Sequence, residues 1–172
     1  MIKTSPIRKI AFAGVLIALG VVGSLFSFPL LGSRCAPVQH FINIVAAVTL
    51  GPWYGLGMAF CTSLLRISFG LGTLLAFPGS MCGAFLAGML FRAFRHPFPA
   101  FAGELVGTSV LGGLLSFPIA VQALGLSPEN GIFVFVVPFF LSSAVGCILA
   151  VILLFSLHKT GIWQQIRKWD KA

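Results

Sequence analysis

Long apolar runs, separated by short polar or glycine- and proline-rich segments, dominate this chain. Runs of about 20 apolar residues are long enough to cross the hydrocarbon core of a membrane as helices. The pattern predicts six such helices, joined by short loops and followed by a polar tail. Their expected ranges are 10–28, 37–50, 54–69, 80–91, 99–121 and 132–157, with the tail at 158–172. The second and fourth are short for a span, which leaves a tilted or partly re-entrant path open.

Composition places most of the protein surface in lipid. Of the 172 residues, 58% are hydrophobic and only 8% are charged, and the mean hydropathy is +1.06. A soluble domain carries roughly a quarter charged residues. We therefore predict an all-α integral membrane protein, in which residues 1–172 form one six-helix membrane domain.

The distribution of basic residues predicts the orientation. The net charge is +8, but the lysines and arginines flank the apolar runs, as the positive-inside rule describes, and do not indicate a nucleic-acid partner. With both termini in the cytoplasm, only Arg34 lies in an outer loop. Nine basic residues then lie inside: Lys3, Arg8, Lys9, Arg92, Arg95, Lys159, Arg167, Lys168 and Lys171. The tail alternates aromatic, apolar and basic residues at helical spacing, which predicts an amphipathic helix on the inner leaflet.

A dense polar stretch at 34–43 interrupts the apolar pattern. Pro37 favours the first turn of a helix, because its φ is fixed and it has no N–H group to leave unpaired. Gln39 and Asn43 then lie one turn apart, with His40 beside them. Polar side chains within a membrane are costly unless something satisfies them, so these three predict a solute site near the outer surface.

Arg66 lies within the third predicted helix, near its outer end. Two interpretations stay open: the side chain snorkels outward or caps loop carbonyls, or it donates hydrogen bonds to a polar or anionic part of a solute. Thr73 and Ser80 are expected in or beside the following outer loop, at a similar depth.

Glu104 is expected near the inner end of the fifth helix, beyond direct reach of the outer cluster. Arg92 and Arg95 belong to the same inner surface. We therefore predict an ion pair with these arginines in preference to a proton-coupling role.

The sequence lacks the motifs of several kinds of enzyme and metal site. The chain has no GxxxxGK[ST] phosphate loop and no HExxH or GxSxG motif, so we expect neither ATPase nor enzyme activity. Its cysteines form no CxxC pair, and we expect no metal and no cofactor. A small-solute channel or facilitator is the competing class, and it predicts transport by the purified chain alone.

The chain resembles the substrate-binding S components of energy-coupling factor (ECF) vitamin transporters, specifically the ThiW type. The segments that carry the resemblance are 11–20, 37–43, 50–54, 62–66, 72–81 and 103–108. The most specific part is Phe77-Pro78-Gly79-Ser80. The resemblance implies a six-helix protein of a prokaryotic cell membrane that binds its solute near the outer face. It also implies a transmembrane scaffold subunit and two cytoplasmic ATPases as partners.

The resemblance further implies the ligand and the docking face. The expected ligand is hydroxyethylthiazole, the thiazole precursor of thiamine, or its phosphate; another vitamin or the pyrimidine half of thiamine is the alternative. Family members dock through small residues of the first helix, typically Ala-x-x-x-Ala. That pattern falls on Gly14 and Ala18, with Ala11 one turn earlier and glycine in place of the first alanine.

Overall fold

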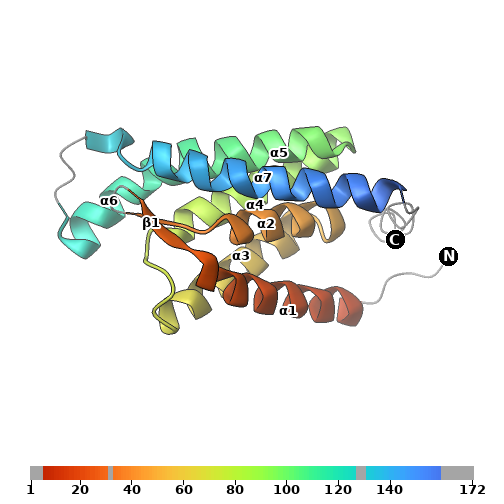
Figure 1. Ribbon diagram of the computed structural model, residues 1–172, viewed down its shortest axis with the longest axis horizontal. Coiled ribbons are helices and arrows are strands. Elements are labelled where there is room, and N and C mark those ends of the chain that lie inside the picture. Colours follow the sequence, from red (N-terminus) through yellow and green to blue (C-terminus); the bar gives the residue numbers. More distant parts are fainter. Residues whose placement is uncertain (1–5, 31–32, 127–130, 160–172) are drawn as a thin grey trace.

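The computed structural model describes residues 6–30, 33–126 and 131–159, so most of the predicted tail at 158–172 lies outside the described residues. The helices pack side by side in an elongated bundle (Figure 1). They are α1 (Pro6–Gly23), α2 (Pro37–Thr49), α3 (Pro52–Ser68), α4 (Ala76–Phe94), α5 (Pro97–Val106), α6 (Gly113–Leu124) and α7 (Val136–Lys159). The shorter elements are η1 (Ser24–Phe26), β1 (Phe28–Leu30), β2 (Ser33–Cys35), the π-helical η2 (Gly107–Gly112) and η3 (Gly131–Phe133).

Length and composition make this a membrane protein. Within the described residues, four helical segments are long and apolar enough to cross a bilayer: Pro6–Phe26, Ala76–Phe94, Pro97–Leu124 and Gly131–Leu157. The helices α2 and α3, with 13 and 17 residues, are shorter. In Figure 1, α1 begins and α7 ends at the same end of the bundle. The count of six spans and the cytoplasmic termini stay predictions.

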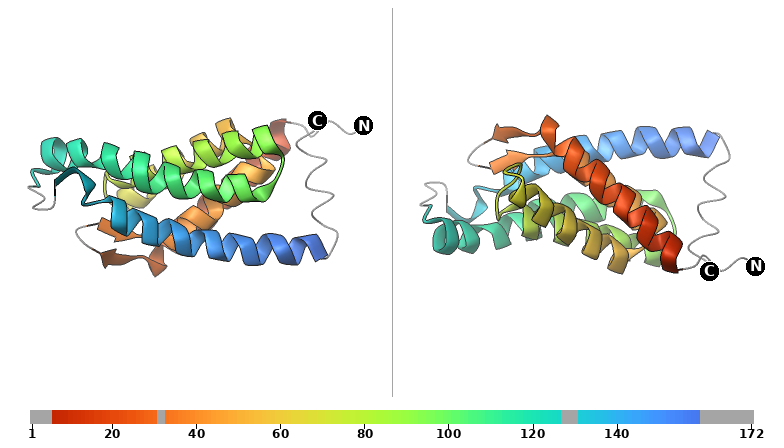
Figure 2. Two further views of the ribbon diagram at one scale, coloured as in Figure 1. Left: turned by 90° about the horizontal axis from the view of Figure 1, so that it is seen from above. Right: turned by 90° about the horizontal axis from the view of Figure 1, so that it is seen from below.

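The first helix ends earlier than the predicted range 10–28. It gives way after Gly23 to the turn η1 and then to an antiparallel hairpin, in which Phe28 lies opposite Cys35 and Pro29 opposite Arg34. The reason is local: a residue before proline disfavours the helical conformation, and Pro29 has no N–H group to donate. Figure 2 shows this β1–β2 hairpin at the end of the bundle where α1 ends and α7 begins.

Helix α2 is the centre of the bundle. It packs against α1, α3, α4, α5 and α7, and most of its side chains are buried. Ile44 belongs to an apolar cluster shared with α4, α5 and α7, whereas Ile42 belongs to one shared with α1 and α3. The helix starts at Pro37 and stops before Gly51, whose φ of 84° suits glycine. Its polar residues are therefore surrounded by protein.

The segment predicted as one helix over 99–121 runs from Pro97 to Leu124 and contains the π-helical η2. Glycines allow η2 to approach α4 very closely. A Cβ atom at Gly112 would lie 2.5 Å from Gly79 Cα, and one at Gly107 would lie 2.6 Å from the Cys82 carbonyl oxygen. This close packing brings the polar residues of α5 and η2 against α2 and α4.

Candidate functional site

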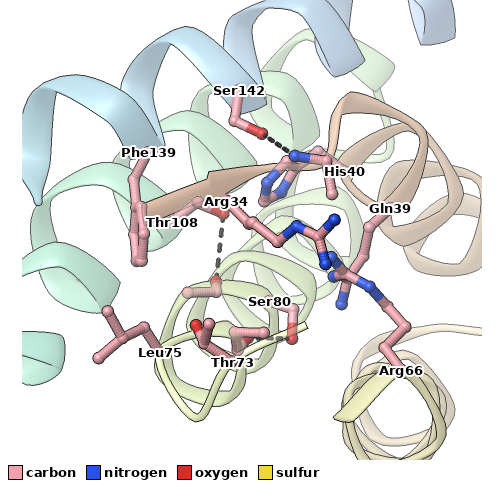
Figure 3. A pocket seen from close by; sticks show the side chains of 13 residues that line it. Arg34, Gln39, His40, Arg66, Thr73, Leu75, Ser80, Thr108, Phe139 and Ser142 are labelled. Carbon is pink, nitrogen blue, oxygen red and sulfur yellow. Dashed lines mark hydrogen bonds between the residues drawn. The ribbon is translucent and has the colours of Figure 1, made fainter. Parts of the chain in front are cut away.

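A small polar cavity lies at the hairpin end of the bundle (Figure 3). Its volume is about 30 Å³, which is room for one or two water molecules. The lining comes from the hairpin, α2, α3, α4, η2, α7 and the loop before α4. The lining residues are Arg34, Ala36, Gln39, His40, Arg66, Thr73, Leu75, Ala76, Gly79, Ser80, Thr108, Phe139 and Ser142.

The structure brings five of the six predicted substrate residues around this one cavity: Gln39, His40, Arg66, Thr73 and Ser80. They come from three helices and a loop, so the arrangement depends on tertiary packing. Their contact with a ligand stays a prediction.

Asn43, the sixth predicted residue, does not line the cavity. It is completely buried, and its Nδ2 donates to the Ser80 carbonyl oxygen at 3.2 Å and to Glu104 Oε1 at 3.1 Å. The Asn43 side chain therefore ties α2 to α4 and α5 behind the cavity wall. Its role in this conformation is to hold lining residues in place.

A buried hydrogen-bond network converges on Glu104. His40 Nδ1 lies 2.8 Å from Glu104 Oε1, and the same oxygen accepts from Asn43 Nδ2 and from Thr108 Oγ1, each at 3.1 Å. His40 and Glu104 share this hydrogen bond through Nδ1, so Nε2 is the ring nitrogen left for other contacts. Glu104 Oε2 has no hydrogen-bond partner among the described residues.

The prediction that Glu104 pairs with Arg92 and Arg95, out of reach of the outer cluster, is wrong. Glu104 is completely buried against His40, whereas both arginines are exposed. Helix spacing alone put the two residues near opposite surfaces, whereas α2 packs against α5 and brings His40 Nδ1 within 2.8 Å of Glu104 Oε1.

A row of hydroxyl groups supports Gln39. Its Nε2 donates to Ser63 Oγ at 3.2 Å, and Ser63 Oγ lies 2.8 Å from Ser80 Oγ. Ser80 in turn donates to the Ala76 carbonyl oxygen at 2.8 Å. The first hydrogen bond joins α2 to α3, the second joins α3 to α4, and the third lies within the first turn of α4. This row of hydroxyl groups therefore holds α2, α3 and the start of α4 together along the cavity.

Two arginines, Arg34 and Arg66, present guanidinium groups to the cavity (Figure 3). Arg66 is only 2% exposed, and its Nε has no hydrogen-bond partner among the described residues. The snorkelling interpretation of Arg66 therefore does not hold. Arg34 is the arginine that caps a loop carbonyl, because its Nη1 donates to the Gly70 oxygen at 3.1 Å.

Sequence reasoning missed eight of the lining residues, and four of these have polar or aromatic side chains: Arg34, Thr108, Phe139 and Ser142. The Ser142 hydroxyl accepts from the Ala36 backbone N–H at 2.9 Å and so fastens the hairpin to α7. The sequence signal for it was the adjacent pair Ser142 and Ser143 inside a long apolar run.

The small residues predicted as the docking strip, Ala11, Gly14 and Ala18, are all exposed on α1. A Cβ atom built on Gly14 would meet no atom within 4 Å. This face is therefore uncovered in the single chain, and its contact with a partner stays a prediction.

Comparison with known proteins identifies a family. No curated protein and no solved structure matches the chain. Residues 10–160 match the family model described as "Thiamine-precursor transporter protein (ThiW)". That range covers most of the 172 residues and includes every residue that lines the cavity. The chain therefore belongs to the ThiW family of thiamine-precursor transporter proteins.

Proposed function

We propose that the chain is the substrate-binding S component of an ECF-type importer in a prokaryotic cell membrane, with six transmembrane helices and cytoplasmic termini. It captures hydroxyethylthiazole or its phosphate at the outer face. The single observation that carries the proposal is the cavity that gathers Gln39, His40, Arg66, Thr73 and Ser80. Membership of a thiamine-precursor transporter family supports the class of solute.

The lining suits a small ring with one polar arm. Phe139 and Leu75 supply an apolar wall, and the opposite side carries amide, imidazole and guanidinium groups. Glu104 holds the Nδ1 side of His40, so Nε2 is the nitrogen that addresses a hydroxyl group of the solute. A thiazole with a hydroxyethyl arm is larger than about 30 Å³, so binding requires the cavity to widen.

Transport then requires energy from partners. The chain captures the solute, and ATP hydrolysis by two partner ATPases, acting through a transmembrane scaffold subunit, tilts the whole bundle to expose the cavity inward. The exposed strip formed by Ala11, Gly14 and Ala18 is the contact with the scaffold, because small residues allow helices to approach closely.

Binding and transport by the purified chain test the proposal. Calorimetric titration with hydroxyethylthiazole is expected to show binding that Arg66→Ala and Asn43→Ala abolish, although both variants insert normally. Gln122→Ala is the matched control, since it removes an amide from an exposed position of α6. If both site variants bind like the wild type, the site assignment is wrong.

Liposomes separate an S component from a self-sufficient channel. The chain alone is expected to bind radiolabelled hydroxyethylthiazole without accumulating it, and uptake should require the scaffold, the ATPases and ATP. Ala18→Leu should retain binding and lose this uptake, whereas Ala102→Leu, the same change on the exposed face of α5, should retain both. Solute flux through the chain alone would identify a channel or facilitator instead.

A further inference from the structure

We infer that the cavity takes a ligand that carries a phosphate monoester group, and that Arg34 and Arg66 together hold this group. The inference rests on the proposed function and deepens it, because it selects the anionic form among the thiazole-type solutes. It assigns Arg34, on the hairpin, a direct binding role.

The charge of the cavity supports the inference. Two guanidinium groups line it, from β2 and from α3, and none of its lining residues is acidic. Both guanidinium groups face this one small cavity (Figure 3). Like charges at short range repel each other, and a bound anion relieves that repulsion.

Arg66 is the strongest single indication. It is among the largest fully buried side chains of the described residues, and its Nε lacks a partner there. A buried guanidinium without a counter-charge is costly, so its position in a cavity wall points to an anionic ligand. The one described carboxyl group nearby, that of Glu104, lies behind the wall and is engaged by His40 and Asn43.

Two helix N-termini add to this environment. Helix α2 begins at Pro37 and α4 at Ala76, and neither has a side-chain cap. The first N–H groups of α4 bond to the preceding loop, Ala76 to the Thr73 oxygen and Phe77 to the Leu74 oxygen, so its contribution is that of the helix dipole. The residues that precede them, Ala36 and Leu75, both line the cavity. The N-terminal end of a helix carries partial positive charge and favours anions.

The geometry favours a phosphate monoester over a carboxylate. A guanidinium group binds an oxyanion through two parallel N–H donors. Two such groups from separate elements, with the hydroxyl of Thr73 in the same lining, supply more donors than the two oxygens of a carboxylate require. A phosphate monoester offers three terminal oxygens to them. The apolar wall of Phe139 and Leu75 is left for the organic part of the ligand.

Titration of the full-length purified chain with hydroxyethylthiazole and with its monophosphate tests the inference. The monophosphate is expected to bind at least about tenfold more tightly, and this preference should decrease as the salt concentration rises. Arg34→Gln and Arg66→Gln should each remove most of the preference. Arg66→Lys keeps the charge but loses the bidentate geometry, and an intermediate preference is expected. Arg92→Gln is the matched control, because it removes one exposed arginine at the other end of α4.

Equal or tighter binding of the neutral alcohol would overturn the inference and leave the proposed function intact. If neither thiazole binds, the proposed function fails, and a second measurement decides about the anion site. Inorganic phosphate should then raise the thermal unfolding midpoint of the wild type and of Arg92→Gln, but not that of Arg34→Gln. An equal rise in all three proteins, or no rise in the wild type, refutes the anion site.

Discussion

Replacing Glu104 tests the buried network that supports the cavity. In Glu104→Ala, Asn43 Nδ2 retains its hydrogen bond to the Ser80 carbonyl oxygen, at 3.2 Å. Thr108 Oγ1 likewise retains its hydrogen bond to the Gly79 carbonyl oxygen, at 3.2 Å. His40 Nδ1 loses the one partner that the described network gives it. The substitution therefore leaves one buried ring nitrogen unpaired and opens a small void in place of the side chain.

The expected loss of stability follows from these contacts. An unpaired buried polar group costs about 1–3 kcal/mol, and loss of one buried methylene adds about 0.8 kcal/mol. We therefore expect Glu104→Ala to lower the free energy of unfolding by about 2–4 kcal/mol. Glu104→Gln keeps the volume and one acceptor oxygen but places an amide N–H group at the unpartnered Oε2 position, so its expected cost is smaller, about 1–2 kcal/mol.

Unfolding by SDS in mixed detergent micelles, followed by circular dichroism, measures these differences. Gln122→Ala, at an exposed position of α6, should change stability by less than about 0.5 kcal/mol. A double-mutant cycle with His40→Ala should give a coupling energy of about 1 kcal/mol between His40 and Glu104. A cost below about 0.5 kcal/mol for Glu104→Ala, or strict additivity in the cycle, would refute the network.

Two further substitutions, each with a matched control on α3, are tested with the same unfolding assay. The first concerns packing and the second a hydrogen bond. Gly112→Ala would place a Cβ atom 2.5 Å from Gly79 Cα, so we expect a loss of about 1–3 kcal/mol. Gly57→Ala on α3, where a Cβ atom meets nothing within 4 Å, should be neutral or stabilising by up to about 1 kcal/mol. Equal changes in stability for Gly112→Ala and Gly57→Ala would contradict the close contact of η2 with α4. Ser63→Ala removes the acceptor for Gln39 Nε2 at 3.2 Å and should cost about 1 kcal/mol. Ser68→Ala, exposed on the same helix, should cost almost nothing, and an equal loss there would count against the hydroxyl row.

The sequence by itself determined the features that depend on local chemistry. Apolar composition indicates a membrane protein, and the structure contains four segments that are long and apolar enough to span. The fixed φ of Pro37 indicates the start of a helix, and α2 starts there. Helical spacing then places Gln39, His40 and Asn43 on neighbouring faces. The resemblance to the ThiW type, carried by short segments along the whole chain, is confirmed by the family match.

Only the tertiary structure decided which polar groups meet. Glu104 lies 64 residues after His40 in the chain, and no local pattern relates the depths of their helices. Those depths depend on the packing of α2 against α4 and α5, and on the glycines that admit α5 and η2 close to α4. The β1–β2 hairpin brings Arg34 to Arg66. Periodicity describes one helix at a time, whereas the cavity and its charge arise from contacts between helices, because packing alone sets their relative heights.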